Sequence, residues 1–395
     1  MKVLRPAQCK RRKFGNLIDR SPRNSCAGKI FLEDPLRNTL KRAASVSVIA
    51  ASVVAMLAAC GTAPAATTST AASKYLPCIV SDQGGFNDRS FNQLGLEGVT
   101  AAAKTLGTTF KQVQSKSANE YGPNITSLIG EGCNIIVASG FNLIAAVKTA
   151  ATANPKVNFL MIDDNSIALP NVKSVVFETD EAGFLAGYAA ASESKSGVIG
   201  TFGGAKYPSV TIFMDGIVAG VKYYNTQKSK SVKVIGWDIA AQDGQFVGSF
   251  TDLNTAKTIA KSMLDQGADV LAPIGGPIYQ GAAAAIKDGG KDDALIGNDA
   301  DVFLTDTNGL KDMFLTSILK NIKPTVNTIV LAAARDKTFD NSQYVGNLKN
   351  DGVGIAPFHS YSSKVNSDLT AEITKAKAGI IDGSIVVGSP ASFKK

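Results

Sequence analysis

The sequence predicts an α/β fold made of two lobes, each built on a parallel β-sheet. From Lys74 onward, strand-like and helix-like segments alternate along the chain. Such alternation is typical of β-α-β units with right-handed crossovers. It restarts near residue 196, and each half holds about five strand-like segments. A chain of 395 residues with 45% apolar residues is long enough for two folded domains.

Short apolar runs bounded by Gly, Asp or Asn predict strands, and apolar residues spaced three and four apart predict helices. In the first half we expect strands at 75–82, 108–115, 133–140, 157–164 and 172–179, and helices at about 89–105, 119–132, 142–155 and 180–193. In the second half we expect strands at 196–204, 231–239, 268–276 and 293–299, and helices at 208–225, 253–267 and 278–290. A further amphipathic helix is expected at 316–336, with short strands at 352–358 and 383–388.

The basic character of the chain is confined to its N-terminus. Of the 41 Lys and Arg residues, 12 lie in the first 59 positions, together with only three of the 33 acids. The remainder is close to neutral, which argues against a nucleic-acid-binding surface on the folded part. Residues 37–61 join a basic start to an apolar run of small residues, the pattern of a signal peptide. The alternative is a single transmembrane helix, for which a run of about 17 residues is at the lower limit.

The apolar run ends in "LAAC" followed by Gly61, which resembles the lipobox of bacterial lipoproteins. That resemblance implies cleavage before Cys60 and diacylation of its thiol. We therefore expect residues 1–59 to be an N-terminal extension with a signal peptide, without a fold in 1–36. Residues 60–74 are small and polar and are expected to form a flexible tether. The protein would then be extracytoplasmic and anchored to the cell membrane.

Two cysteines, Cys78 and Cys133, open two of the predicted strands. In a sheet ordered 2-1-3 these strands are neighbours, close enough for a disulfide. An exported domain lives where disulfides persist. We expect a bond between the two cysteines, with a pair of buried free thiols as the alternative.

Polar and aromatic side chains follow the predicted strands, where ligands of parallel α/β sheets bind. Asp82, Asp163 and Asp299 occupy such strand ends, and Phe250 and Gly276 follow strands of the second half. Carboxylates accept hydrogen bonds from vicinal hydroxyls or ring N–H groups, and aromatic faces stack on flat rings. With few cations nearby, this set favours a sugar joined to a base over a phosphate.

Blander interpretations apply to several of these residues. Asp164 and Asp301 are candidates for simple helix caps, and Phe250 could belong to the lobe core. Asp88 is interpreted as the cap of the helix that carries Phe91 and Asn92. The single histidine, His359, excludes multi-histidine metal centres, and no G-x-x-x-x-G-K-[ST] or G-x-G-x-x-G motif is present. We expect no cofactor, no metal and no enzymatic activity.

The segment "SDQGGFNDRSFNQLGLEG" at 81–98 resembles the signature of the basic membrane protein family, the PnrA-like purine-nucleoside receptors of ABC importers. Further matches follow in order, among them "VASGF", "NFLMIDD", "GVIGTFGG", "VGSFTD" and "IGNDAD", so that the resemblance covers about residues 76–388. It implies a type I periplasmic-binding-protein fold, with two Rossmann-like lobes joined by a hinge. The implied function is to bind a nucleoside, with a purine base, and to deliver it to ABC permease and ATPase subunits as a monomer.

The resemblance also implies roles for eight residues. It implies first-lobe ligand contacts for Asp82, Phe91, Asn92 and Asp163, a second stacking ring for Phe250, a backbone contact for Gly276, and a grip on the ribose hydroxyls for Asp299 and Lys320. Phe91 would lie against the base, and Lys320 would project from a helix facing the cleft. Lobe 1 would comprise 75–180 and about 305–335, and lobe 2 about 185–304 and 336–395.

The sequence departs from the family pattern near the expected ligand. "GFNLIAA" lacks the acid common after this Gly-Phe pair, Asn298 replaces a small apolar residue, and Pro277 is unusual. Three alternatives therefore remain: a receptor for a sugar or riboflavin-like compound, a nucleoside hydrolase using Asp82 and Asp163, and a transcriptional regulator of the same fold. The export leader and the absence of a basic helix-turn-helix count against the regulator.

Overall fold

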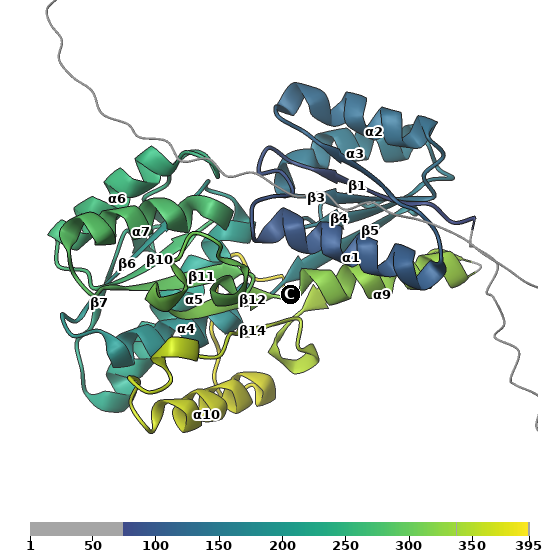
Figure 1. Cartoon of the computed structure of the whole chain (residues 1–395). Coiled ribbons are helices and arrows are strands. Elements are labelled where there is room, and N and C mark those ends of the chain that lie inside the picture. The colour runs from purple at the N-terminus through teal and green to yellow at the C-terminus, as the bar shows by residue number, and fades with distance from the viewer. Residues whose placement is uncertain (1–73, 337, 394–395) are drawn as a thin grey trace, which may run out of the picture. The chain divides into compact units, whose positions relative to one another are not determined.

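The computed structural model describes residues 74–336 and 338–393, which belong to one compact unit. The predictions for residues 1–73, including the lipidation of Cys60, lie outside the described residues. The described chain forms two α/β lobes, each with helices on both faces of a sheet (Figure 1). None of its helices is both long enough and apolar enough to cross a membrane.

Lobe 1 is built on a six-stranded sheet with the order β13-β5-β4-β3-β1-β2, in which every neighbouring pair is parallel. Its strands are β1 (Pro77–Ser81), β2 (Lys111–Gln114), β3 (Ile135–Ser139), β4 (Asn158–Ile162), β5 (Val172–Phe177) and β13 (Tyr344–Gly346). Its helices are α1 (Phe91–Leu106), α2 (Tyr121–Gly130), α3 (Ile144–Ala153) and α9 (Ile322–Arg335). Helices α1 and α9 pack together on one face, and α2 and α3 cover the other (Figure 1). Strands buried on both faces explain the unbroken apolar runs.

Lobe 2 repeats this plan with the order β14-β12-β11-β10-β6-β7. Its strands are β6 (Val198–Gly203), β7 (Lys233–Ile235), β10 (Val270–Ile274), β11 (Ala294–Asp299), β12 (Phe314–Lys320) and β14 (Val353–Ile355). Its helices are α4 (Thr179–Glu193), α5 (Pro208–Lys228), α6 (Leu253–Asp265), α7 (Tyr279–Gly289), α8 (Val302–Thr305) and α10 (Leu369–Asp382). Only the edge strand β14 runs antiparallel to its neighbour. Helices α4 and α5 approach each other closely at Gly187 and Gly220. A Cβ atom at either position would clash with the backbone of the opposite helix.

Short elements complete the described chain. These are the two-stranded sheet of β8 (Trp237–Asp238) and β9 (Asp243–Gly244), and the 3₁₀ turns η1 (Ala118–Glu120), η2 (Phe141–Leu143), η3 (Gly276–Ile278), η4 (Lys311–Met313), η5 (Leu348–Asn350) and η6 (His359–Tyr361). The sheet order places β2, β1 and β3 side by side, as expected. Cys78 and Cys133 form a disulfide there, with their Cα atoms 5.9 Å apart.

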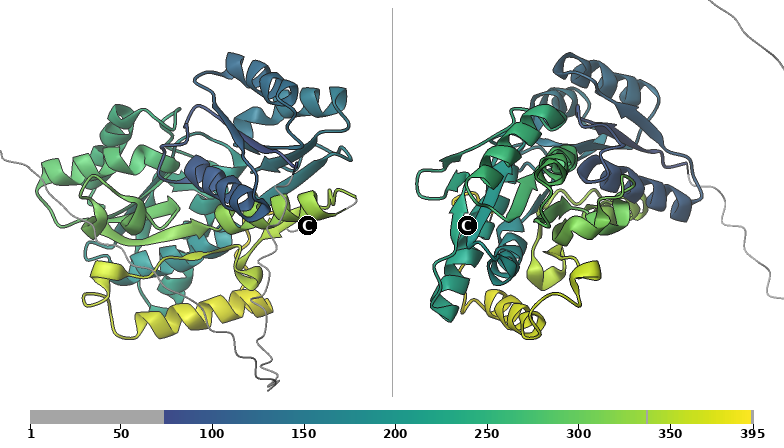
Figure 2. Two further views of the ribbon diagram at one scale, coloured as in Figure 1. Left: turned by 45° about the vertical axis from the view of Figure 1, so that its right-hand side comes forward. Right: turned by 60° about the vertical axis from the view of Figure 1, so that its left-hand side comes forward.

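Within the described residues, the chain passes between the lobes three times (Figure 2). It leaves lobe 1 after β5, returns after β12, and leaves again between β13 and β14. When several chain segments pass between two lobes at one place, they form a hinge rather than a flexible linker. The carboxyl ends of the central strands of both sheets face this region, so ligand-binding residues are expected there.

The predicted helix at 316–336 is wrong over its first part. Residues 314–320 form the interior strand β12, and only 322–335 are helical. Strand β12 is buried on both faces, so its apolar residues lack the alternation that separates a strand from a helix. Lys320 therefore ends a strand of lobe 2 and does not project from a helix.

The predicted lobe boundaries change with this strand. The segment 305–335 was assigned to lobe 1, but β12 belongs to the lobe 2 sheet and only α9 packs in lobe 1. The segment 336–395 was assigned to lobe 2, but β13 pairs with β5 in lobe 1. Residues 383–388 hold no strand, and the helix α10 before them was not predicted.

Candidate functional site

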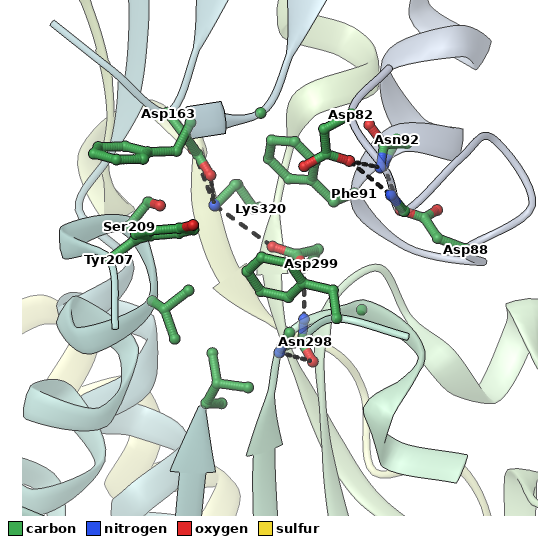
Figure 3. Close-up of a pocket in the computed structure, with 18 of the residues that line it drawn as sticks. Asp82, Asp88, Phe91, Asn92, Asp163, Tyr207, Ser209, Asn298, Asp299 and Lys320 are labelled. Atoms are coloured by element: carbon green, nitrogen blue, oxygen red, sulfur yellow. Dashed lines mark hydrogen bonds and ion pairs between the residues drawn. The ribbon is translucent and has the colours of Figure 1, made fainter. Parts of the chain in front are cut away.

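A cavity lined by charged, amide and apolar side chains lies between the lobes, at the carboxyl ends of the central strands of both sheets (Figure 3). It contains about 580 Å³ of space, part of it open to solvent. All eight residues singled out from the sequence line it: Asp82, Phe91, Asn92, Asp163, Phe250, Gly276, Asp299 and Lys320.

Asp82 contributes a buried carboxylate from the end of β1. Its Oδ1 accepts hydrogen bonds from Gly84 N and Asn92 Nδ2, both at 3.0 Å. Burial raises the pKa of Asp82, and these donors, together with the Asn142 amide, oppose that rise. The Oδ1 atom of Asn92 is buried without a partner in the protein. A side chain that has used its donor and kept its acceptor can take an N–H group from a ligand.

Asp88 holds the start of helix α1. Its carboxylate accepts from the backbone N–H groups of Ser90, Asn92 and Gln93 at 2.7–3.1 Å, which is the capping role expected from the sequence. Burial raises the pKa of Asp88 to about 6, against the effect of these three donors. The cap fixes the first turn of α1, and so the direction in which Phe91 and Asn92 enter the cavity.

Asp163 and Asp299 occupy matching places in the two lobes, directly after β4 and at the end of β11. Both have left-handed backbone conformations, with φ of 71° and 63°. Such φ values are uncommon for residues other than glycine, although Asp tolerates them better than most. Residues held in sparsely populated conformations cluster at functional sites. The two acids converge on one side chain, Lys320 (Figure 3).

Lys320 reaches into the cavity from the end of β12 and is only 3% exposed. Its Nζ bonds both carboxylate oxygens of Asp163, at 2.9 and 3.0 Å, and lies 3.6 Å from Oδ1 of Asp299. Burial by itself would lower the pKa of Lys320, but the two carboxylates outweigh it and raise that pKa. Burial raises the pKa of Asp163 to about 6, although Lys320 opposes the shift. At neutral pH the pair is an ion pair that joins the two lobes.

Aromatic rings surround this ammonium group. Nζ of Lys320 lies 5.1 Å from the ring centroids of Phe91 and Phe213, and 5.7 Å from that of Phe177. These distances allow cation–π attraction. On the lobe 2 side, Phe250 packs against Gly204 and Gly275, where a Cβ atom would meet its ring. Gly276 also lines the cavity, and no atom lies near the position that a Cβ would take there.

The charges of the lining residues are unbalanced. Four carboxylates, those of Asp82, Asp88, Asp163 and Asp299, face a single cationic side chain, Lys320. The positive charge of Lys320 is already compensated by its two nearest carboxylates, those of Asp163 and Asp299. The cavity therefore suits a neutral ligand rich in hydroxyl or N–H donors, and it opposes a phosphate or carboxylate group.

Further lining residues were missed or undervalued in the sequence. Tyr207, Ser209, Phe213 and Asn142 line the cavity, and Asn298 does so beside Asp299. Tyr207 stacks on Phe141 at 4.7 Å, across the space between the lobes. Tyr207 follows β6 and Asn142 follows β3, so the strand-end rule could have identified both residues.

Several other residues lie outside the cavity. Trp237 is buried and donates to Asp215, away from the cavity. His359 pairs with Asp301 at 2.8 Å and stacks on Phe303. The capping role expected for Asp164 and Asp301 is wrong. Asp164 accepts from Ser166 in its own turn, and the side chain of Asp301 makes no capping bond to α8. In the part of the chain that the structure describes, no group of three or more His, Cys, Asp or Glu residues could hold a metal ion.

Comparison with known proteins gives consistent results. Residues 77–389 match the family described as ABC transporter substrate-binding protein PnrA-like. The ABC transporter nucleoside-binding protein BmpA of Lactococcus lactis is 35% identical over 370 residues, which cover 88% of this chain and 99% of that protein. Basic membrane protein A of Borreliella burgdorferi is 30% identical over 315 residues, covering 78% and 86%.

Solved structures agree on the fold. A solute-binding protein of an ABC transporter system from Aeropyrum pernix K1 has a TM-score of 0.71 at 22% identity, covering 81% of this chain and 94% of its own. A transcriptional activator of the comK gene from Bacillus halodurans has a TM-score of 0.63, also at 22% identity, covering 79% and 99%. Because a solute-binding protein and a transcriptional activator share this architecture, the fold by itself does not decide the function.

Proposed function

This chain belongs to the PnrA-like family of ABC transporter substrate-binding proteins, and from that premise we propose that its ligand is a nucleoside with a purine base. The observation that carries the proposal is the chemistry of the cavity between the lobes. Carboxylates from both lobes flank one buried ammonium group, and aromatic rings and an unpaired amide oxygen lie in the same cavity.

The ribose would be held by Asp299, Lys320 and Asp163. Vicinal hydroxyl groups can donate to a carboxylate and accept from an ammonium group at the same time, which matches the mixed charges around Lys320. Asp299 is the better acceptor for a ribose hydroxyl, because its Oδ1 lies 3.6 Å from Nζ and is not closely bonded to it. The backbone of Gly276 would supply a further contact.

The base would lie against Phe91, with Phe250 on its other face. Rings of this kind stack on flat heterocycles with little loss of conformational freedom. Asp82 and Asn92 would face the polar edge of the base, where a carboxylate and a free amide oxygen accept N–H groups. The excess of carboxylates favours a nucleoside over a nucleotide, since a phosphate would meet several negative charges.

The transport role follows from the family, and its details are part of the proposal. The two lobes would close on the ligand at the hinge, and the closed form would dock on the permease of an importer. The protein would act as a monomer, held outside the cytoplasm by a lipid on Cys60 and a tether over 60–74. Metabolic labelling with a palmitate analogue tests the anchor: wild type should be labelled, and Cys60→Ser should not.

The ligand is tested by isothermal titration with guanosine, inosine, adenosine and riboflavin, and by mass spectrometry of small molecules that co-purify with the protein. We expect heat with at least one purine nucleoside. Heat with riboflavin or a sugar alone would replace the proposed ligand, and no heat with any nucleoside would refute it. Release of free base from inosine at a useful rate would instead support a hydrolase using Asp82 and Asp163.

A further inference from the structure

Two hydroxyl groups reach across the cavity from one lobe to the other. Tyr207 belongs to lobe 2, at the start of α5, and bonds to lobe 1. Ser90 belongs to lobe 1, at the start of α1, and bonds to lobe 2. The Tyr207 contact does not involve Lys320, whereas the Ser90 contact reaches Asp299, one of the two carboxylates near Lys320. The two contacts add to the connection that Lys320 makes between the lobes.

The Tyr207 hydroxyl donates to Oδ1 of Asn142 at 2.9 Å, while its ring stacks on Phe141 at 4.7 Å with an interplanar angle of 22°. Asn142 has its amide nitrogen left for a second partner, and that partner is the Asp82 carboxylate. Tyr207 is thereby linked through one lobe 1 side chain to the carboxylate at the end of β1. The Tyr207 hydroxyl favours the orientation of the Asn142 amide in which its nitrogen faces Asp82.

The Ser90 hydroxyl makes the reciprocal contact. It lies 2.9 Å from the Asn298 carbonyl oxygen and 3.1 Å from Oδ2 of Asp299, so that its proton can serve either acceptor. Asn298 adds a bond from its own Nδ2 to the same Oδ2, at 2.6 Å. Both donors therefore occupy Oδ2 of Asp299 and leave Oδ1 to face Lys320 and the cavity.

Ser90 stands at the position of a helix cap without acting as one. Its side chain makes no capping bond to α1, because Asp88 accepts the N–H groups of the first turn instead. The residue is fully buried at the boundary between the lobes. A buried hydroxyl that is not needed by its own helix is available for a partner in the opposite lobe.

We propose that Tyr207 and Ser90 are positioning residues which complete the orientation of Asp82 and Asp299 only when the lobes close. Each lobe then supplies the last hydrogen bond that the binding carboxylate of the other lobe needs. Asn142 takes part in the connection through Tyr207, and Asn298 takes part in the connection through Ser90. Closure and formation of the binding geometry become one event, and the closed form gains stability without any ligand.

The effect on binding follows from the populations of the open and closed forms. A ligand that binds the closed form has an apparent affinity reduced by the fraction of protein that is closed. Loss of either hydroxyl should lower that fraction and speed dissociation by about three- to tenfold, the worth of one net hydrogen bond. Guanosine and inosine should be affected by the same factor, since neither hydroxyl is assigned to the base. This part of the inference rests on the proposed nucleoside function.

The test compares Tyr207→Phe and Ser90→Ala with two matched controls inside lobe 2. Tyr188→Phe removes a phenol hydroxyl that donates to Glu372 at 2.9 Å, and Ser360→Ala removes a hydroxyl bonded to Asp312. Small-angle scattering of the ligand-free proteins should report a smaller closed fraction for the two cross-cleft variants and no change for the controls. Stopped-flow dissociation of guanosine should be faster in the same two variants, with association nearly unchanged.

A double-mutant cycle separates positioning from general packing. In an Asn142→Leu background, Tyr207→Phe should have no further effect on the closed fraction, because its acceptor is already gone. Equal closed fractions in wild type and both cross-cleft variants, or full additivity with Asn142→Leu, would overturn the inference. If no nucleoside binds to any variant, the proposed ligand fails, while the scattering experiment still decides about the hydroxyl contacts.

Discussion

The two lobes share one sheet plan but use equivalent strand ends differently. The positions match in order: β1 with β6, β3 with β10, β4 with β11 and β5 with β12. Strands β4 and β11 are alike, because an Asp in a left-handed backbone conformation stands at the end of each. The first strands differ, because β1 is followed by a carboxylate at Asp82 and β6 by Gly204, which lies under the ring of Phe250.

This difference teaches where the polar recognition is concentrated. Lobe 1 carries three of the four lining carboxylates, whereas lobe 2 supplies the fourth carboxylate and the only lining cation, Lys320. The cation bonds more closely to the acid of the other lobe, at 2.9 Å, than to the acid of its own, at 3.6 Å. The lobes are thus complementary halves of one site rather than two copies of half a site.

The largest effect should come from removing the cation on which this complementarity depends. In Lys320→Ala, Asp163 and Asp299 remain buried without their shared partner. Breaking one side of a buried ion pair costs about 3–5 kcal/mol. Isothermal titration with guanosine should show binding weakened to that extent or abolished.

The matched control for this change is Lys323→Ala. Lys323 pairs with Glu97 at 2.8 Å, but both side chains are well exposed, at 51% and 36%. Exposed pairs contribute at most about 1 kcal/mol, so guanosine affinity should stay within twofold of wild type. Retained affinity in Lys320→Ala would show that the two acids do not depend on the cation of lobe 2.

The disulfide is a further difference between the lobes, because it joins β1 to the start of the β3 segment in lobe 1. Replacing both cysteines in Cys78→Ala/Cys133→Ala should lower the free energy of unfolding by about 2–4 kcal/mol, as expected for a cross-link between distant residues. Urea denaturation monitors the loss. Hydrogen exchange should become faster in β1 and β3 and stay unchanged in β6 and β10; equal acceleration in both lobes would contradict this assignment.

The matching acids test how alike the lobes are at their common position. Asp163→Asn and Asp299→Asn keep a residue that tolerates the left-handed conformation, so the backbone should not change. Each should weaken guanosine binding by about 2 kcal/mol, because a charged hydrogen-bond acceptor is lost. Asp163→Asn should have the larger effect, since Asp163 bonds Lys320 through both oxygens.

Asp299→Ala separates the backbone from the side chain at the same place. The left-handed conformation costs alanine roughly 1–2 kcal/mol of free energy, so this variant should also be less stable than Asp299→Asn. Thermal unfolding without ligand measures the difference. Equal stability of the two variants would show that the conformation at the end of β11 relaxes when the acid is removed.

The parts that could be predicted from sequence are those set by local pattern. The β-α-β alternation predicted the fold class, and the rule for strand ends together with the family resemblance selected eight residues that line one cavity. Segment 314–320 was misassigned because a strand buried on both faces carries no alternation. The predicted lobe boundaries are wrong for the same reason. Assigning β12 to a helix of lobe 1 misplaces one of the points at which the chain passes between the lobes.

What the sequence could not provide are contacts between the lobes. Asn142 and Asn298 were noticed only as departures, yet each orients a carboxylate of the cavity. The bonds of Ser90 to Asn298 and of Tyr207 to Asn142 join residues far apart in the chain. They depend on how two separately predicted lobes meet, and periodicity carries no information about that geometry.

The smallest predicted effect concerns pH, and it has opposite signs for binding and stability. Asp88 and Asp163 have pKa values of about 6 in the folded protein, raised by burial, and near 4 when unfolded. Between these values the folded protein keeps protons that the unfolded chain releases, so the free energy of unfolding should increase as pH falls from 6 toward 4.

Protonation of Asp163 also removes an acceptor, so guanosine affinity should fall, by about tenfold from pH 7 to pH 5 for one proton. In Asp163→Asn the affinity should be nearly independent of pH over this range, and a slope as steep as in wild type would assign the titration to another carboxylate, with Asp88 as the next candidate.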